Sequence, residues 1–174
     1  MRRDLLAATL LSTLFCATAA DAKLGEEIDK YKQRVAKAYT LKNQATKDGK
    51  TNYSFVINSD PTLAKAAPGF GGGVTITVEH GKITGQSMVL RLGQNSDVGK
   101  EIAVRFALDF AFEALGRAVP KTKKELSDEV NSYRTVINSA LAGAPQNVRY
   151  PKLTGKITVS KTADGSLVLA ATPG

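Results

Sequence analysis

Cysteine, histidine and tryptophan are nearly missing from this 174-residue chain, which has one cysteine, one histidine and no tryptophan. A histidine-rich metal site needs more than one imidazole, and no carboxylate cluster lies around His80 in the sequence. Catalysis by serine or cysteine needs a base, and no Gly-x-Ser-x-Gly motif accompanies His80. We therefore expect no catalytic residue, no metal and no cofactor. A lysine–serine pair stays open, because its members need not be adjacent in the sequence.

The single cysteine, Cys16, lies in a segment with the pattern of a secretory signal peptide. Two arginines precede an apolar run from Leu5 to about Ala20, and small residues suited to cleavage follow. The run is shorter than the roughly 20 residues of a comfortable membrane span. We predict a signal peptide at residues 1–22, cleaved between 19 and 22, and no transmembrane anchor afterwards. The expected location is the periplasm or the exterior of the cell.

Cleavage at this point removes the chain's only thiol. A lipid anchor would need Cys16 as the first mature residue, normally after small residues, whereas Leu14 and Phe15 precede it. The mature protein is then free of cysteine and cannot form disulfides. The remaining residues, about 150, suffice to bury one core without cross-links. We predict one domain at residues 23–174.

Acidic residues are scarce relative to basic ones, with 16 Asp and Glu against 24 Lys and Arg, for a net charge of +8. Such an excess favours anionic partners. The lysines are scattered and no aromatic residues interleave with them, which argues against a base-stacking nucleic-acid surface. An acidic protein is the favoured partner. Anionic lipid and a small apolar ligand are the alternatives.

Periodicity in the first third of the mature chain predicts a helix and then a strand. Apolar residues recur at spacings of three and four from Leu24 through Tyr39, so the helix is expected to run from Leu24 to about Gln44. After a polar stretch at 45–50, the alternation from Tyr53 to Ile57 predicts a strand. Ser59-Asp60-Pro61 is expected to end it.

Glycines gather in residues 68–73, around Phe70. A phosphate-binding loop would lead into a helix, but residues 74–79 alternate as a strand, so the glycines predict a flexible entry to a hairpin. His80-Gly81 is expected to form its turn before a strand at 82–92. The apolar phase of that strand changes near Gly85-Gln86, which predicts a β-bulge.

Two helices and a second hairpin complete the expected fold. The helices run from Ser96-Asp97 to Gly116 and, after the capping box Thr122-Lys-Lys-Glu125, to about Leu141. The hairpin lies within 154–171, with its turn at Ala163-Asp-Gly165. We predict an α+β fold: an antiparallel sheet of about five strands, one strand plus two hairpins, with three helices mainly on one face. Alternation places polar side chains on the other face, namely Thr75, Thr77, Glu79, Thr158, Ser160 and Ser166.

Asp109 and Glu113 form the one carboxylate pair with a spacing suited to acid–base work or metal binding. Arg105 and Arg117 flank the pair at the same spacing. We interpret the four residues as ion pairs in contact with solvent.

These observations favour an exported, non-catalytic binding protein that recognises another protein, as an inhibitor or immunity-type factor. Candidate binding segments are the loops 62–73 and 144–153 or an exposed strand edge, and the candidate binding residues are Phe70, Arg91, Arg149 and Tyr150. Arginine and tyrosine are favoured in protein contacts. A carrier with an internal apolar cavity is the alternative, and an enzyme of another kind is the second.

Overall fold

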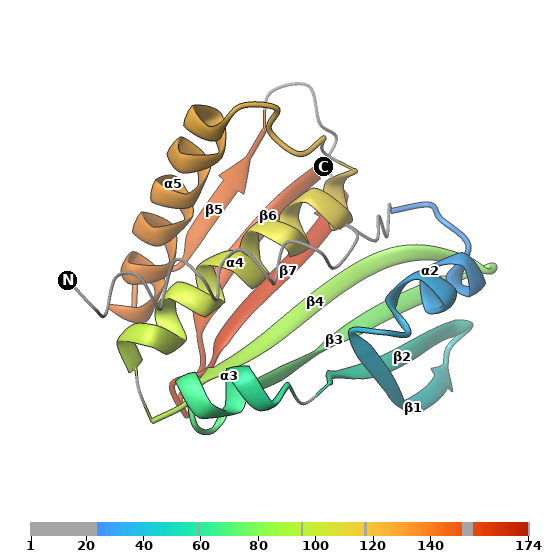
Figure 1. Cartoon of the computed structure of the whole chain (residues 1–174). Coiled ribbons are helices and arrows are strands. Elements are labelled where there is room, and N and C mark those ends of the chain that lie inside the picture. The colour runs from blue at the N-terminus through green and yellow to red at the C-terminus, as the bar shows by residue number, and fades with distance from the viewer. Residues whose placement is uncertain (1–23, 59, 95, 117, 151–154, 174) are drawn as a thin grey trace.

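The computed structural model describes residues 24–58, 60–94, 96–116, 118–150 and 155–173. Their strands form one antiparallel seven-stranded sheet in the order β1-β2-β3-β4-β7-β6-β5 (Figure 1). In chain order the elements are α2 (Ile28–Val35), β1 (Tyr39–Lys47), β2 (Lys50–Ile57), α3 (Pro61–Ala66), β3 (Phe70–Glu79), β4 (Lys82–Leu92), α4 (Ser96–Leu115), α5 (Lys123–Leu141), β5 (Gln146–Arg149), β6 (Gly155–Lys161) and β7 (Leu167–Pro173). The α+β class is confirmed. The expected counts are too low, since the described residues form seven strands and four helices.

The expected signal peptide at 1–22, with Cys16, lies outside the described residues. Within the described part of the chain, no helix has the length and apolar character needed to cross a membrane.

The expected helix from Leu24 to Gln44 is wrong in its second half, where the chain forms strand β1. Helix α2 ends at Val35, and β1 pairs with β2 from Tyr39↔Ile57 to Lys47↔Lys50. Asp48 and Gly49 join the two strands with φ values of 51° and 75°, the left-handed conformation that suits a two-residue hairpin turn. The polar stretch 45–50 therefore forms the end of a β-hairpin.

A short helix, α3, lies where only the end of a strand was expected. The Asp60 carboxylate accepts hydrogen bonds from the backbone N–H groups of Thr62 (2.7 Å) and Leu63 (3.1 Å), and Pro61 occupies the first turn. These bonds satisfy donors that a helix start leaves free and lower the pKa of Asp60. Asp60-Pro61 thus begins a helix.

The glycine segment is a strand, not a flexible loop, because β3 begins at Phe70. A Cβ atom on Gly72 would lie 2.0 Å from the carbonyl oxygen of Val89 on β4. One on Gly73 would lie 2.3 Å from the carbonyl oxygen of Phe55 on β2. The glycines allow the backbones of three neighbouring strands to approach closely.

The β3–β4 hairpin follows the prediction. His80 and Gly81 have φ values of 51° and 77° at the turn. The register changes where Thr77 pairs with Gly85 and Val78 pairs with Ile83, which leaves Thr84 as the extra residue. The bulge turns Ile83 toward the buried side together with Met88 and Leu90.

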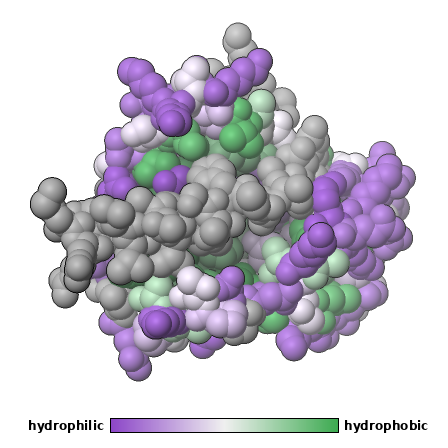
Figure 2. Space-filling model, in the orientation of Figure 1, coloured by the Kyte–Doolittle hydropathy of each residue, from purple (hydrophilic) through white to green (hydrophobic). Residues whose placement is uncertain are grey.

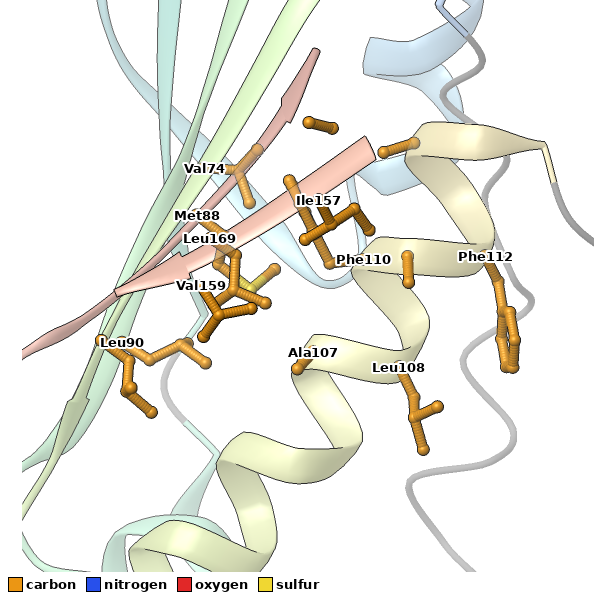
Figure 3. Packing of buried hydrophobic residues seen from close by; sticks show 14 of the residues in the cluster. Val74, Met88, Leu90, Ala107, Leu108, Phe110, Phe112, Ile157, Val159 and Leu169 are labelled. Carbon is orange, nitrogen blue, oxygen red and sulfur yellow. The ribbon is translucent and has the colours of Figure 1, made fainter. Parts of the chain in front are cut away.

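Helix α4 packs on the sheet, with α5 beside it on the same face (Figure 1). Between α4 and the sheet lie buried residues of four strands: Val74, Met88, Leu90, Ile157, Val159 and Leu169 (Figure 3). Small residues bring the helix close, since a Cβ on Gly99 would lie 1.9 Å from the carbonyl oxygen of Leu92. Each large apolar side chain buried here contributes about 1.5–3 kcal/mol.

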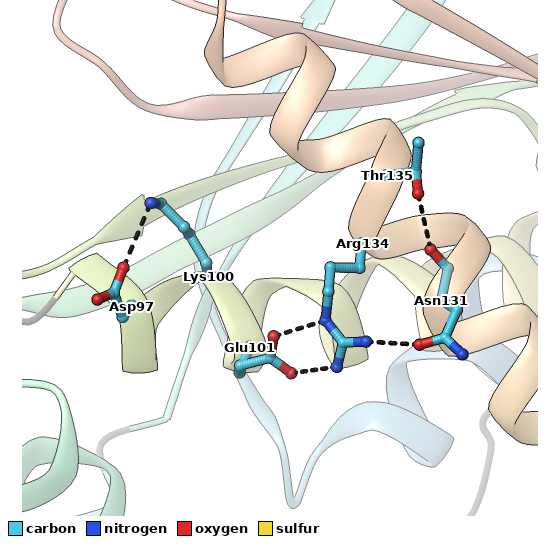
Figure 4. A network of polar contacts seen from close by, with 6 residues as sticks. All are labelled: Asp97, Lys100, Glu101, Asn131, Arg134 and Thr135. Carbon is cyan, nitrogen blue, oxygen red and sulfur yellow. Dashed lines mark hydrogen bonds and ion pairs between the residues drawn. The ribbon is translucent and has the colours of Figure 1, made fainter.

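Helix α5 begins with the expected capping box. The backbone N–H of Glu125 donates to the Thr122 hydroxyl, and the backbone N–H of Thr122 donates to the Glu125 carboxylate, both at 3.2 Å. On the outer side of the helix pair, Arg134 of α5 binds Glu101 of α4 and also donates to the Asn131 side chain (Figure 4). Polar contacts therefore join α4 and α5 on the side that faces away from the sheet, whereas apolar residues join them to the sheet.

The C-terminal strands extend the sheet further than expected. β6 and β7 are the two strands of the predicted hairpin. β5, inside the expected loop 144–153, adds a third strand through pairs from Gln146↔Val159 to Arg149↔Lys156. Residues 151–154 lie outside the described residues.

Candidate protein-binding face

Strand register aligns one row of side chains across the whole sheet. Successive pairs join Asn43, Ser54, Thr75, Ser87, Ala170, Thr158 and Asn147, one residue from each strand. Paired residues on neighbouring strands point to the same side of a sheet. Six of these seven side chains are small uncharged hydrogen-bonding groups. We call this set the polar row.

The polar row lies on the face opposite the helices. The inward neighbours Val74, Met88 and Leu169 pack under α4, so the residues between them point the other way (Figure 3). Helix α2 packs on the helix side as well, since the Tyr31 ring meets the buried Phe55 ring edge-on at 5.5 Å. We call the opposite side the open face.

A short apolar row runs beside the polar row. The register places Val56, Gly73, Val89 and Val168 side by side on β2, β3, β4 and β7. Val89 is 41% exposed, which makes it one of the most exposed large apolar side chains among the described residues. The open face thus places an apolar strip beside hydroxyl and amide groups, and a protein interface uses both apolar contact and hydrogen bonds.

Hydrogen bonds order two of the polar pairs. The Thr77 hydroxyl donates to the Asn52 side-chain oxygen at 2.8 Å, and the Thr158 hydroxyl donates to that of Asn147 at 3.1 Å. Such bonds limit the side-chain freedom that a partner would otherwise have to restrict.

Cations lie around the margin of the open face. Lys156 pairs with Arg149 at the β5 side, and Arg91 pairs with Gly71 near the end of β4. At the other corner Glu79 binds Lys50 at 2.9 Å, and this hydrogen bond lowers the pKa of Glu79. The half-buried Glu79 carboxylate of that corner therefore already has a cationic partner.

The four candidate residues do not form one site. Phe70 is half-buried, with its ring centre 5.7 Å from that of Phe106 on α4. The Tyr150 hydroxyl donates to the Tyr133 hydroxyl at 2.9 Å, so Tyr150 belongs to the helix side. Arg91 and Arg149 are both exposed but lie toward opposite ends of the strands. The two arginines belong to the margin of the open face.

Of the polar residues expected opposite the core, Thr75, Thr77 and Thr158 lie on the open face. Ser166 does not, because it is 4% exposed and its hydroxyl donates to the Asp164 carboxylate. Ser54, Ser87 and Asn147 were missed, although each alternates with apolar residues in the sequence. Alternation assigns a residue to a face, but only the register shows which residues align.

A separate polar cluster lies where α4 approaches α2 and β1. Desolvation, followed by the charge of Glu113, raises the pKa values of Tyr31 and Tyr39. Desolvation also raises the pKa of Asp109 to about 6, against the opposing effect of Arg105. Asp109 is exposed and interacts favourably with the charge of Arg105, as the ion-pair interpretation expects, whereas Arg117 lies outside the described residues.

The described residues contain no group of three or more His, Cys, Asp or Glu that could hold a metal ion. His80 lies at the β3–β4 turn with a positive φ of 51°.

No family model, curated protein or solved structure matches this chain.

Proposed function

We propose that this protein is an exported, non-catalytic binding protein that recognises an acidic partner protein through the open face of its sheet. The observation that carries the proposal is the polar row, which crosses all seven strands on the side opposite α4.

The surface chemistry suits a protein partner. Hydroxyl and amide groups offer both donors and acceptors, and the neighbouring row of Val56, Val89 and Val168 offers apolar contact. All of these side chains are short and lie on paired strands, so association restricts few rotamers.

Charge supports an acidic partner. Arg91, Arg149 and Lys156 lie on the margin, and the whole chain has a net charge of +8. Opposite charges on the partner would speed the encounter and make binding weaker at high salt.

The carrier alternative needs an internal apolar cavity. The described core residues between α4 and the sheet pack against one another (Figure 3), and no observation on them favours such a cavity. For the enzyme alternative, the Asp109 carboxyl has a pKa raised to about 6, and it lies on the helix side, away from the polar row.

The test is affinity capture from the envelope fraction of the native host, with identification of bound proteins by mass spectrometry. Tagged wild type should retain one acidic protein in roughly equal amount, and raised salt should release it. Ser87→Glu places a carboxylate in the middle of the polar row and should abolish the capture. Ser132→Glu makes the same change on the exposed surface of α5 and should leave the capture intact.

Arg91→Glu and Arg149→Glu should each weaken the capture as well, since each reverses one marginal charge. Equal retention by Ser87→Glu and wild type would exclude the open face. Recovery of a small molecule without a protein would instead support the carrier alternative.

A further inference from the structure

The sheet has one long free edge, strand β1. β1 has nine residues and is the first strand in the sheet order, while the opposite edge strand, β5, has four. No described strand pairs with the outer side of β1. From Thr40 to Lys47 every residue is exposed. Such an edge presents backbone groups that can pair with another strand.

The hairpin turn determines which backbone groups point outward. Lys47 and Lys50 flank the two-residue turn and pair with each other. In such a hairpin this pair exchanges backbone hydrogen bonds, and the pattern alternates along the strand. The N–H groups of Thr46 and Gln44 therefore point away from β2.

The lysine side chains along this edge determine which kind of added strand is favoured by charge. Lys42 and Lys47 lie on β1, Lys50 lies on β2 beside the turn, and Lys37 precedes β1. The side of the molecule that carries α2 and the β1–β2 hairpin is predominantly hydrophilic (Figure 2). A second copy of the chain would bring two lysine-rich edges together, and like charges on paired strands are destabilising. An acidic strand meets no such repulsion.

We propose that the outer edge of β1 binds an extended acidic peptide segment as an eighth strand. Backbone hydrogen bonds from Gln44 and Thr46 would hold the peptide, and Lys42 and Lys47 would favour carboxylates on it. The register shift between Leu41 and Asn43 distorts the strand and limits the pairing to its second half, from Asn43 to Lys47. The site is the backbone edge of β1, which adjoins the open face at Asn43, and it does not depend on the function proposed for that face.

Three synthetic fluorescent peptides of equal length test the proposal by anisotropy. One alternates Glu with Thr, one alternates Glu with Pro, and one alternates Lys with Thr. The Glu–Thr peptide should bind, because it has both the charge and the backbone donors. The Glu–Pro peptide keeps the charge, but proline fixes φ near −65° at every second residue, far from the roughly −140° of an antiparallel strand, so it should bind at least about tenfold more weakly. The Lys–Thr peptide should not bind.

Gln44→Pro is the matched change in the protein. Proline is tolerated where the N–H faces away from the sheet, so the β1–β2 pairing should persist while the outward donor is lost. Affinity for the Glu–Thr peptide should fall about tenfold with Gln44→Pro and stay unchanged with Gln44→Ala. If Gln44→Pro disturbs the hairpin, amide hydrogen exchange on wild type replaces it, and the peptide should slow exchange at Gln44 and Thr46. Equal binding of the Glu–Thr and Glu–Pro peptides, no binding of the Glu–Thr peptide, or no protection of these amides would overturn the proposal.

Discussion

Arg134 on α5 binds both carboxylate oxygens of Glu101 on α4, with its Nε and Nη2 atoms each donating a hydrogen bond of 2.7 Å (Figure 4). These bonds lower the pKa of Glu101 below its ordinary value of 4.5. The stabilisation is therefore present above the unfolded pKa and is lost as the pH falls through the folded value.

We expect Arg134→Met to lower the free energy of unfolding by about 0.5–1 kcal/mol at neutral pH. Partly exposed ion pairs stabilise a fold only slightly, but the bidentate geometry of this pair strengthens it. Urea titrations should show a smaller difference from wild type near pH 3 (about one unit or more below the unfolded pKa of Glu101). Lys124→Met breaks the exposed Lys124–Asp128 pair and is the control, with no measurable loss expected. A loss that is the same at both pH values would show that Arg134 acts through packing instead.

Gly72→Ala should destabilise the fold strongly. Its Cβ would meet a backbone carbonyl oxygen at 2.0 Å, and strand β3 would have to move away from β4. We expect a loss of about 1–3 kcal/mol in thermal or urea unfolding. At Gly71 the nearest atom to a new Cβ is the Arg91 Nη2 atom at 4.0 Å, so Gly71→Ala should be tolerated. Similar stability of the two variants would contradict the close approach of the strands.

Asp109 should make stability depend on pH in the opposite sense to Glu101. Its folded pKa of about 6 is above the ordinary value of 3.8, so its favourable contribution is present below the unfolded pKa and is lost as the pH rises through 6. Asp109→Asn removes the charge that is costly to desolvate. Relative to wild type it should gain about 1 kcal/mol between about pH 5 and pH 8, a figure reduced for the contact of Asp109 with solvent.

Paired unfolding curves at the two pH values measure this difference. Asp128→Asn removes an exposed carboxylate from α5 and should show a much smaller change. A constant difference between Asp109→Asn and wild type would exclude titration of Asp109 as the cause.

Substitutions at the neighbouring residues Arg149 and Tyr150 should affect different properties, partner binding for Arg149 and fold stability for Tyr150. Tyr150→Phe removes the hydrogen bond to the Tyr133 hydroxyl and should cost about 0.5–1.5 kcal/mol of stability without reducing capture of the acidic partner. Arg149→Glu should leave the melting temperature unchanged but weaken the capture, because Arg149 is exposed at the margin of the open face. Weaker capture by Tyr150→Phe under conditions where it stays folded would move the binding surface to the helix side.

Features that depend on local chemistry could be predicted from the sequence. The capping box at Thr122 and Glu125 needs only two side chains three residues apart, and it forms as expected. The bulge near Gly85 follows from a change in apolar phase, and the structure places the extra residue at Thr84. Such signals lie within a few neighbouring residues, so no distant contact is needed to interpret them.

Features that depend on pairing between distant segments could not be predicted from the sequence. Tyr39 continues the helical spacing of α2 but begins strand β1, because it pairs with Ile57 across the Asp48-Gly49 turn. Alternation could assign Thr75 and Thr158 to one face, but their alignment in the polar row requires β7 to lie between β4 and β6. The sequence by itself determined the basic charge, the capping box of α5 and the polar alternation, since these follow from composition and short spacing. The tertiary structure alone decided the edge strand and the alignment of the polar row, because strand order brings together residues that are far apart in the chain.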